Sequence, residues 1–298
     1  MKNKKMLGNI LLLITAMIWG TAFVAQRVGM ESIGPVTFTS ARMWLAALTA
    51  GTASLFLGKG KPEAAEPGTR RETLIGDICC GLFLAAASLF QQYGIVTTTA
   101  GKAGFITALY ILLVPILNLV IFRQKGGLHV WLAIAVGVFG MYLLCMTEGF
   151  RLTRGDTLVS CCALVFSGHI LCCDHFSRRG DPVRIAAVQF VTVALVSGVI
   201  ALIVETPSPA QLRAAAIPIL WCGVMSGGVG YTLQMTAQRF TDPTVASLLM
   251  SLESVFAALT GALLLGERMS GRELLGCVIM FAAIVLVQLP APKRKSVE

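Results

Sequence analysis

The chain has 298 residues, of which 56% are hydrophobic and only 13% are charged, and its mean hydropathy is +0.78. This composition excludes a soluble globular domain and indicates a protein that lies in a lipid bilayer. A membrane β-barrel would alternate apolar and polar residues, and the sequence lacks this alternation, so we expect helices to span the membrane. The net charge of +9 requires no nucleic-acid partner, because basic loops beside anionic lipid head groups account for it.

Ten apolar runs are separated by charged residues, Gly or Pro, and each is long enough to cross a bilayer as a helix. In the first half the runs cover residues 8–26, 34–57, 74–96, 99–122 and 128–146. In the second half they cover residues 155–173, 182–204, 214–237, 242–265 and 270–289. Residues 58–73 are rich in Lys, Glu, Pro and Gly, and we expect them to form a loop exposed to solvent.

The basic residues of the predicted loops favour one face of the membrane. If the N-terminus lies in the cytoplasm, the cytoplasmic segments carry most of the 24 Lys and Arg residues. Lys and Arg are retained on the cytoplasmic side during insertion. The sequence therefore predicts a multi-pass protein with both its N-terminus and its C-terminus in the cytoplasm.

The two halves of the chain contain matching residues at nearly constant separations. A shift of 147 residues aligns Trp19 with Phe166, and a shift of 142 residues aligns Gln92 with Gln234. We interpret these matches as an internal repeat of five helices, and chance similarity between apolar helices is the alternative. Because five is an odd number, a first copy that begins in the cytoplasm makes the second copy begin outside and run inverted.

The predicted fold is thus all-α and integral to the membrane. It has ten transmembrane helices in two inverted five-helix repeats, residues 1–147 and 148–298. Inverted repeats are a recurrent arrangement in transporters, which hold the substrate near the middle of the membrane where the two halves meet. We therefore expect a site for a small molecule between the repeats, in a monomer or a homodimer.

Charged and titratable side chains within the apolar runs are the first candidates for this site, because they are costly in lipid. Glu253 lies at the centre of the ninth run, where it suits reversible protonation or pairing with an amine; a protonated carboxyl group bonded to a neighbouring helix is the alternative. Arg42 in the second run and Lys102 at the start of the fourth either snorkel into water, guard the outer mouth or bind a carboxylate. His169 in the sixth run suits a proton relay.

Amide and aromatic side chains recur at corresponding positions of the two halves, and we expect them to line a cavity for a small polar or cationic ligand. About half of them should instead belong to helix packing or to the interfacial belt. The candidates are Trp19, Gln91, Gln92, Tyr93, Tyr110, Gln189, Trp221, Tyr231 and Gln234. The run Ser-Gly-Gly-Val-Gly at residues 226–230 permits close helix contact and bending.

The sequence predicts no cofactor, no metal centre and no enzyme activity. All nine cysteines fall in apolar runs, which argues against a disulfide framework. Cys172, Cys173, Asp174 and His175 are suitable ligand types, but consecutive helical positions splay too widely to share one ion. The Gly-rich run is not followed by the Lys-Ser or Lys-Thr of a phosphate-binding loop, and no catalytic motif such as His-Glu-x-x-His occurs.

Short motifs spread over nearly the whole chain resemble those of a known family. They are Ala16-Met17-Ile18-Trp19-Gly20-Thr21, Arg42, Pro115, Gly155-Asp156, Pro182, Gln189, Leu252-Glu253, Val255-Phe256-Ala257-Ala258 and Gly266-Glu267-Arg268. With these motifs the chain resembles the drug/metabolite transporter superfamily, in particular its EamA-type ten-helix branch. Two positions depart from the family pattern. Ser254 replaces the usual proline after the glutamate, which leaves the bend of the ninth helix open, and Arg123-Gln124-Lys125 stands where a second Gly-Glu would occur.

The resemblance implies a carrier of the plasma (inner) membrane, usually an exporter of amino acids, amines or related metabolites, that works by alternating access without ATP. In such a carrier, Glu253 and His169 are the candidates for coupling transport to a proton or another ion. We expect its cavity between the first, third, fourth, sixth, eighth and ninth helices. A channel or a lipid scramblase of the same architecture is the alternative function, and saturable, counterion-dependent flux distinguishes a transporter from both.

Overall fold

The structure is a computed structural model that describes residues 2–56, 69–97, 100–123, 127–145, 153–265 and 269–288. These ranges are helical and contain no strand. The helices of the first half are α1 (Lys2–Met30), α2 (Pro35–Phe56), α3 (Arg70–Thr97), α4 (Ala100–Ala108), α5 (Tyr110–Phe122) and α6 (Leu128–Cys145). Those of the second half are α7 (Arg154–Ser177), α8 (Pro182–Val204), α9 (Pro209–Ala214), α10 (Ala216–Leu220), the π-helix η1 (Trp221–Tyr231), α11 (Thr232–Gln238), α12 (Pro243–Met250), α13 (Glu253–Leu265) and α14 (Gly271–Gln288).

Seven segments of the described chain are long and apolar enough to cross a membrane. The described chain also contains one shorter apolar helix. The seven are Lys4–Met30, Arg71–Thr97, Ala103–Phe122, Arg154–Ser177, Pro182–Val204, Ala216–Gln238 and Pro243–Thr260, and the shorter helix is Leu128–Leu144. Helices α2 and α14 occupy the two remaining apolar runs of the sequence. The prediction of an all-helical membrane protein is therefore confirmed. The predicted solvent-exposed loop lies mostly outside the described residues.

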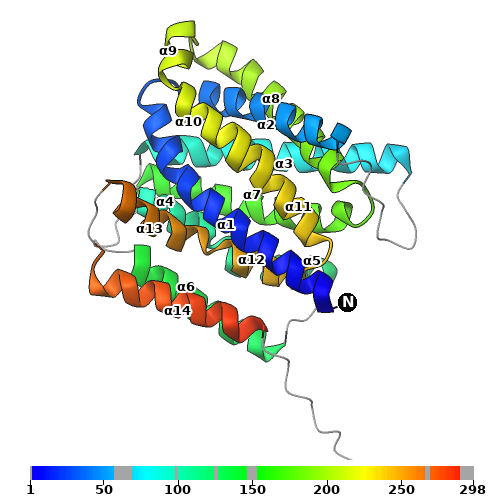
Figure 1. Cartoon of the computed structure of the whole chain (residues 1–298), viewed down its shortest axis with the longest axis vertical. Coiled ribbons are helices and arrows are strands. Elements are labelled where there is room, and N and C mark those ends of the chain that lie inside the picture. The colour runs from blue at the N-terminus through cyan, green and yellow to red at the C-terminus, as the bar shows by residue number, and fades with distance from the viewer. Residues whose placement is uncertain are drawn as a thin grey trace, which may run out of the picture.

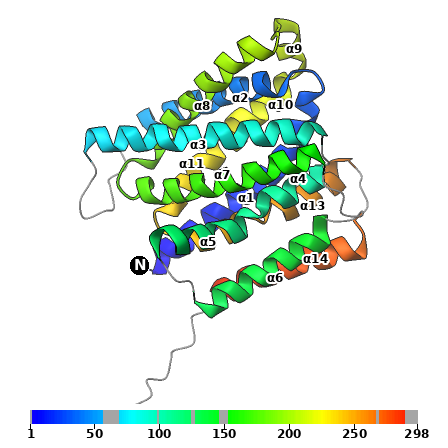
Figure 2. The same ribbon diagram turned by 180° about the vertical axis from the view of Figure 1, so that it is seen from behind.

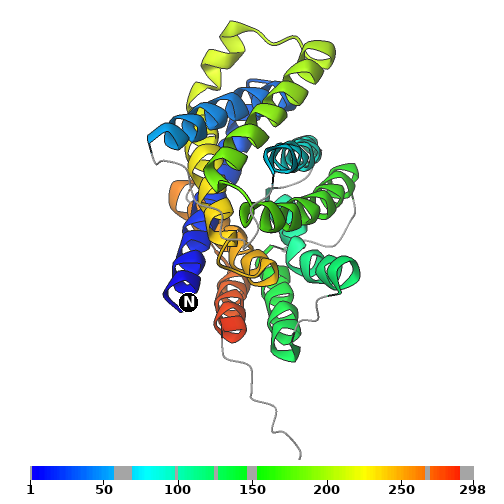
Figure 3. The ribbon, with the colours of Figure 1, turned by 90° about the vertical axis from the view of Figure 1, so that its right-hand side faces the viewer.

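The long helices lie side by side in one bundle, with α1 crossing it diagonally (Figures 1 and 2). The N-terminus lies at one end of the bundle, and α9 and α10 lie at the other (Figure 1). Helix α2 packs against α8, α3 against α7, and α6 against α14. Seen along the bundle, α6 and α14 form a pair at one margin, and α2 and α8 lie at the opposite one (Figure 3).

Polar residues fix where several of these helices begin. Thr153 caps α7 in a reciprocal arrangement, in which its hydroxyl oxygen accepts from the Asp156 N–H while the Asp156 carboxylate accepts from the Thr153 N–H. Asp181 and Asp242 cap α8 and α12, and each is followed by a proline at the first helical position. Such caps satisfy N–H groups that have no partner within the helix, so the short turns between helices are specified locally.

Glu205, the residue after α8, ties this helix to the start of α2. Its carboxylate accepts hydrogen bonds from the Val36 N–H (3.0 Å), the Thr37 N–H (2.8 Å) and the Thr37 hydroxyl group (2.5 Å). A carboxylate at a helix N-terminus satisfies free N–H groups and interacts favourably with the helix dipole. The contact joins the two halves of the chain at the end of the bundle opposite the N-terminus.

We expect Glu205→Ala to lower the free energy of unfolding by about 1–2 kcal/mol, because the first N–H groups of α2 lose their acceptor. Glu205→Gln keeps one acceptor oxygen and should lose less. Thermal unfolding of the purified variants in detergent measures both changes. Equal melting temperatures for Glu205→Ala and the unmodified protein would contradict a stabilising role for this contact.

The apolar segment of α4 and α5 is interrupted at Leu109. The Leu109 N–H donates to the Ile106 carbonyl oxygen (3.2 Å), and the Leu112 N–H donates to the Leu109 carbonyl oxygen (2.9 Å). These i to i+3 bonds are tighter than those of an α-helix. Pro115, inside α5, weakens the same region because it provides no N–H for the carbonyl of Ile111. Tyr110 therefore stands at the first position of the second half-helix.

The segment of α12 and α13 is interrupted in the same way at Ser251 and Leu252. The Ser251 hydroxyl group donates to the Leu248 carbonyl oxygen (2.7 Å), and the Ser254 N–H donates to the Ser251 carbonyl oxygen (3.2 Å). A hydroxyl group that bonds back to the preceding turn competes with regular helix bonds. The interruption therefore forms with Ser254 in place of a proline, which settles the point that the sequence left open.

The Gly-rich run lies in η1, where a wide π-helical turn brings its backbone close to α2. A Cβ atom added to Gly223, which precedes the run in η1, would lie 2.8 Å from the Arg42 carbonyl oxygen. A Cβ atom added to Gly227 would lie 2.5 Å from the Cβ of Ala46. Any larger residue would push the two helices apart, so the predicted close contact is confirmed. Bending of this segment stays a prediction, although π-helical turns are frequent at functional sites.

Candidate functional site

A cavity lies among the helices of both halves. Its walls come from α1, α2, α3, α4, α7, η1 and α13, which are the six helices expected from the sequence together with α2. Its lining residues are Trp19, Ala22, Phe23, Gln26, Arg42, Ala87, Ser88, Gln91, Thr107, Cys162, Phe166, Ser226, Tyr231 and Glu253. A cavity with apolar walls and a few polar groups is typical of a site for a small molecule.

The cavity lies in the half of the bundle that is remote from the N-terminus. Many of its lining residues come from the second halves of α1 and α3, the first half of α2, and the first half and middle of α7. Because α1 runs from the N-terminal end toward the end that carries α9 and α10 (Figure 1), these positions lie between the middle of the bundle and the α9 end. The cavity is therefore nearer to one membrane surface than to the other.

Arg42 lies in the wall of the cavity and does not snorkel to the surface. Its side chain is only 5% exposed, and its guanidinium group lies 6.0 Å from the centre of the Phe38 ring. Its Nε has no hydrogen-bond partner, and no ion pair joins it to any residue that the structure describes. A buried cation without a partner is costly. Arg42 therefore offers a site for an anion from outside the chain.

Glu253 reaches the same cavity from the first turn of α13 and is 4% exposed. Its Oε1 accepts a hydrogen bond from the Tyr110 hydroxyl group at 3.0 Å. Both residues stand directly after the interruptions of their segments, so the two broken helices meet at this bond. Broken helices at membrane depth are typical of substrate and ion sites in transporters. The cavity thus presents one carboxyl group and one guanidinium group to a ligand.

Aromatic rings close the cavity on its inner side. The Trp19 ring lies 4.7 Å from the Tyr231 ring and 6.0 Å from the Phe166 ring, between ring centres. The indole N–H of Trp19 donates to the Ser226 carbonyl oxygen of η1 (3.1 Å), which fixes its orientation. Aromatic faces attract cations such as ammonium groups, so this layer suits an amine as well as an apolar side chain.

Several residues expected to line the cavity lie elsewhere. Gln92 is buried between helices, where its Nε2 donates to the Gln26 Oε1. Trp221 is 41% exposed and donates through its indole N–H to the Thr21 hydroxyl oxygen (3.1 Å). Tyr93 is 40% exposed. None of these three side chains is among the residues that line the cavity, because each faces another helix or the outer surface.

The other expected residues lie behind the cavity wall. Tyr110 touches the site through Glu253 but is itself fully buried. His169, Gln189 and Gln234 are fully buried on the inner side of the aromatic layer. The backbone of Lys102 belongs to α4, and its side chain lies outside the described residues. The role of gating or outer-mouth charge stays a prediction for Arg42, whose side chain lies in the wall of the cavity.

Several lining residues were not candidates from the sequence, chiefly because they are small or apolar. They are Ala22, Phe23, Gln26, Ala87, Ser88, Thr107, Cys162, Phe166 and Ser226. Of these, Gln26 could have been identified from the sequence, because an amide near the end of an apolar run is costly in lipid. In the part of the chain that the structure describes, no group of three or more His, Cys, Asp or Glu side chains is placed to hold a metal ion.

Comparisons with known proteins indicate a transporter. The EamA-like transporter family matches residues 6–146 and again residues 153–289. An uncharacterized transporter of Archaeoglobus fulgidus is 27% identical over 96% of this chain and 87% of its own length. The uncharacterized transporter YoaV of Bacillus subtilis is 22% identical over 98% of this chain and 99% of its own.

A solved crystal structure superposes with a TM-score of 0.80 at 16% identity, over 95% of this chain and 98% of the other, which shows a shared fold. Protein PecM of Dickeya dadantii is 23% identical over 91% of this chain and 89% of its own. These matches cover both halves of the chain and carry its sequence resemblance through nearly every helix. The chain belongs to the EamA-like transporter family, within the drug/metabolite transporter superfamily.

Proposed function

We propose that the protein is a secondary active transporter that exports small amino acids or amines across the plasma membrane by alternating access. The observation that carries the proposal is the convergence of buried Arg42 and Glu253 on one cavity. A zwitterion supplies a carboxylate for the unpaired guanidinium group and an ammonium group for the carboxylate. Opposite charges in a site of low dielectric interact more strongly than they do in water.

The walls of the cavity suit the rest of such a molecule. Trp19, Phe23, Phe166 and Tyr231 supply aromatic surface, which binds apolar side chains and the faces of ammonium groups. Gln91 supplies an amide that is held by the Thr107 hydroxyl group (3.4 Å). This combination favours amino acids and related metabolites over purely anionic or purely apolar compounds.

The packing of the helices supports two inverted five-helix repeats. The α3–α8 contact has a counterpart in the contact of η1 with α2. The α3–α7 contact corresponds to that of α1 with η1 and α11, and the α1–α13 contact corresponds to that of α7 with α4 and α5. Each correspondence exchanges a segment with the one five positions later. In such an arrangement the cavity would lie between two halves that rock against each other.

The orientation, with both termini in the cytoplasm, is tested by thiol labelling. A cysteine at Ser208, just before α9, should react with an impermeant reagent in intact cells, because Lys and Arg mark the opposite side as cytoplasmic. Cysteines at Gly60 and Ser296 should react only after the cytoplasmic side is opened. Labelling of Gly60→Cys in intact cells would contradict the orientation.

Glu253 is the proposed coupling residue, because its carboxyl group can exchange a proton when the cavity opens to water on alternate sides. Ion coupling distinguishes a transporter from a channel or a lipid scramblase of the same architecture. Flux through purified protein in liposomes should saturate with substrate and depend on the proton gradient. Flux that rises linearly with concentration and ignores the gradient would favour the alternatives.

A thermal-shift screen identifies the substrate class without a transport assay. Purified protein is heated with amino acids, amines and nucleosides, because a ligand that binds the folded state raises its melting temperature. We expect amino acids to give larger shifts than the amines formed by removal of their carboxyl groups. Shifts with nucleosides alone would contradict the proposed substrate class.

A further inference from the structure

A second group of polar side chains lies on the other side of the aromatic layer, between α7, α8 and α11. His169, Gln189, Gln234 and Gln238 are each fully buried. The His169 Nε2 lies 3.0 Å from the Gln189 Oε1, and the Gln238 Nε2 donates to the Ile170 carbonyl oxygen at 3.0 Å. Gln234 precedes Gln238 by one helical turn and therefore shares its face of α11.

Most of these amides are not satisfied by the protein. Neither Nε2 nor Oε1 of Gln234 has a hydrogen-bond partner, and Nε2 of Gln189 and Oε1 of Gln238 have none either. Buried polar atoms are nearly always paired, so several orphans in one group need an explanation. The group holds three amides and one imidazole, which supply both donors and acceptors. These atoms are available to hydrogen-bonding groups that are not part of the chain.

The aromatic layer separates this group from the outer cavity. Phe166 and Tyr231 both line the cavity, and both also face His169. The Phe166 ring stacks on the His169 ring at 5.4 Å between centres, and the Tyr231 ring meets it edge-on at 6.0 Å. The Phe166 and Tyr231 rings therefore form the wall between the two polar sites. Movement of these rings would connect the two sites.

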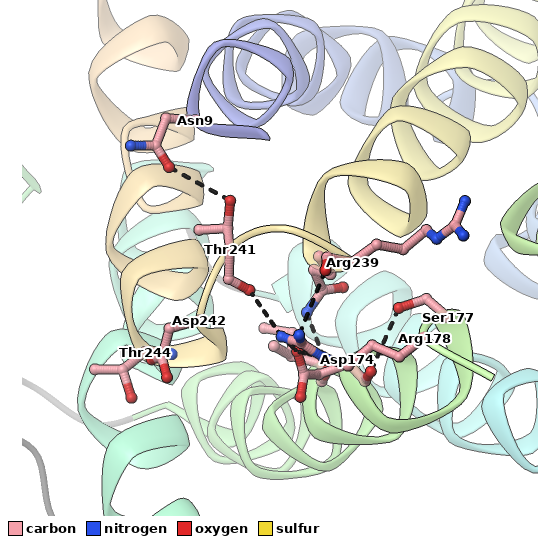
Figure 4. A network of polar contacts seen from close by, with 10 residues as sticks. Asn9, Asp174, Ser177, Arg178, Arg239, Thr241, Asp242 and Thr244 are labelled. Carbon is pink, nitrogen blue, oxygen red and sulfur yellow. Dashed lines mark hydrogen bonds and ion pairs between the residues drawn. The ribbon is translucent and has the colours of Figure 1, made fainter. Parts of the chain in front are cut away.

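Polar contacts close the N-terminal end of the bundle below the group (Figure 4). Arg178, after α7, pairs with Asp174 at 2.8 Å, and its guanidinium group contacts the carbonyl oxygens of Arg239 (3.4 Å) and Thr241 (3.5 Å). The Thr241 hydroxyl group donates to the Asn9 side-chain oxygen at 3.4 Å. These contacts join α7, α1 and the turn between α11 and α12, directly after Gln238.

We propose that His169, Gln189, Gln234 and Gln238 form an inner binding site that holds the hydrogen-bonding groups of the transported molecule when the bundle is open at its N-terminal end. The proposal rests on the transport function proposed above. Water donates and accepts hydrogen bonds as polar groups of the substrate do. Two experiments distinguish a site that binds the substrate from one that holds only water. The inner site differs from the outer cavity because its members include no permanently charged side chain.

The first experiment replaces Gln234 by methionine, which keeps the length of the side chain and removes the unpaired amide. The melting temperature should not fall, because no bond within the protein is lost. Uptake of a mixture of radiolabelled amino acids into proteoliposomes should fall about tenfold or more. A tenfold decrease corresponds to the free energy of about one hydrogen bond between the amide and the substrate. Ser197→Ala is the matched control. Ser197 is also fully buried, on α8, but its hydroxyl group is satisfied by the Val193 carbonyl oxygen (2.6 Å).

Uptake by Gln234→Met at the unmodified rate would overturn the binding role, since an open passage that holds only water does not need this amide. Failure of the variant to fold would also overturn it, because the amide would then be paired within the protein. Failure of the unmodified protein to take up any labelled amino acid would instead count against the proposed function.

The second experiment needs no substrate and uses a native thiol as the reporter. Cys173 is fully buried, and its sulfur lies 3.3 Å from the His169 Nε2. In a variant that keeps only this cysteine, an impermeant methanethiosulfonate reagent should react from the cytoplasmic side in inverted vesicles. The control keeps only Cys277, which is buried on α14, away from the group. We expect Cys173 to react about tenfold faster or more, because only its surroundings open to water. Equal rates would overturn the proposal.

Discussion

Replacement of Glu253 by glutamine is expected to abolish the dependence of transport on the proton gradient and to slow proton-driven transport about a hundredfold. Glutamine keeps the size of the side chain and an oxygen that accepts from the Tyr110 hydroxyl group, which bonds to Glu253 at 3.0 Å. It removes only the exchangeable proton. The protein should therefore fold normally, and the measurement is initial uptake into proteoliposomes with and without an imposed pH gradient.

The matched control is Glu72→Gln at the exposed start of α3, where the carboxylate accepts from the Thr69 N–H (2.8 Å). This change removes a charge far from the cavity and should leave transport unaltered. If Glu253 only neutralises a cationic substrate, its glutamine variant will bind that substrate weakly and still move neutral analogues. Transport by Glu253→Gln at the unmodified rate between about pH 5.5 and 8 would contradict both roles.

Replacement of Arg42 by methionine is expected to weaken the binding of an amino acid about 10- to 100-fold, which is the value of a hydrogen bond to a charged group. The affinity for the corresponding amine, which lacks the carboxylate, should not change. Removing a buried cation without a protein partner should leave the melting temperature the same or raise it. Isothermal titration or thermal shift with both ligands measures the difference.

Arg213→Met in α9 is the control for Arg42→Met, because Arg213 lies on the exposed surface of a short helix and should affect neither ligand. Arg42→Lys keeps the charge and loses the planar fork of the guanidinium group, so its affinity should lie between those of arginine and methionine. Equal losses for the amino acid and the amine would mean that Arg42 shapes the cavity without binding the carboxylate.

The helices of this protein are predictable from its sequence because bilayer thickness sets the length of an apolar run. Every predicted run coincides with a helix or with consecutive helices. The positions of the interruptions at Leu109 and Ser251 and the π-helix that ends at Tyr231 were not detectable, because they depend on i to i+3 bonds and on contacts between helices. No local pattern of residues specifies such contacts.

The charged residues of the site could be predicted from the sequence. The uncharged polar residues could not, because the rotation of each helix determines which of them face the cavity. Arg42 and Glu253 were identified because a charge at membrane depth requires a partner or a cavity, and both lie in the cavity wall. Gln91 lines the cavity and Gln92 does not, although both are amides in the same apolar run. Adjacent helical residues point about 100° apart, and an apolar run reveals no polar face that would fix its rotation.

The most direct test of a transport site formed by Arg42 and Glu253 is counterflow in proteoliposomes. The proteoliposomes are loaded with an unlabelled amino acid that the thermal-shift screen selects. We expect rapid, saturable entry of the same labelled amino acid and much slower entry of its decarboxylated amine, because only the amino acid engages both Arg42 and Glu253. Equal entry of the two compounds, or entry that does not saturate, would contradict a transport site built from this pair of charges.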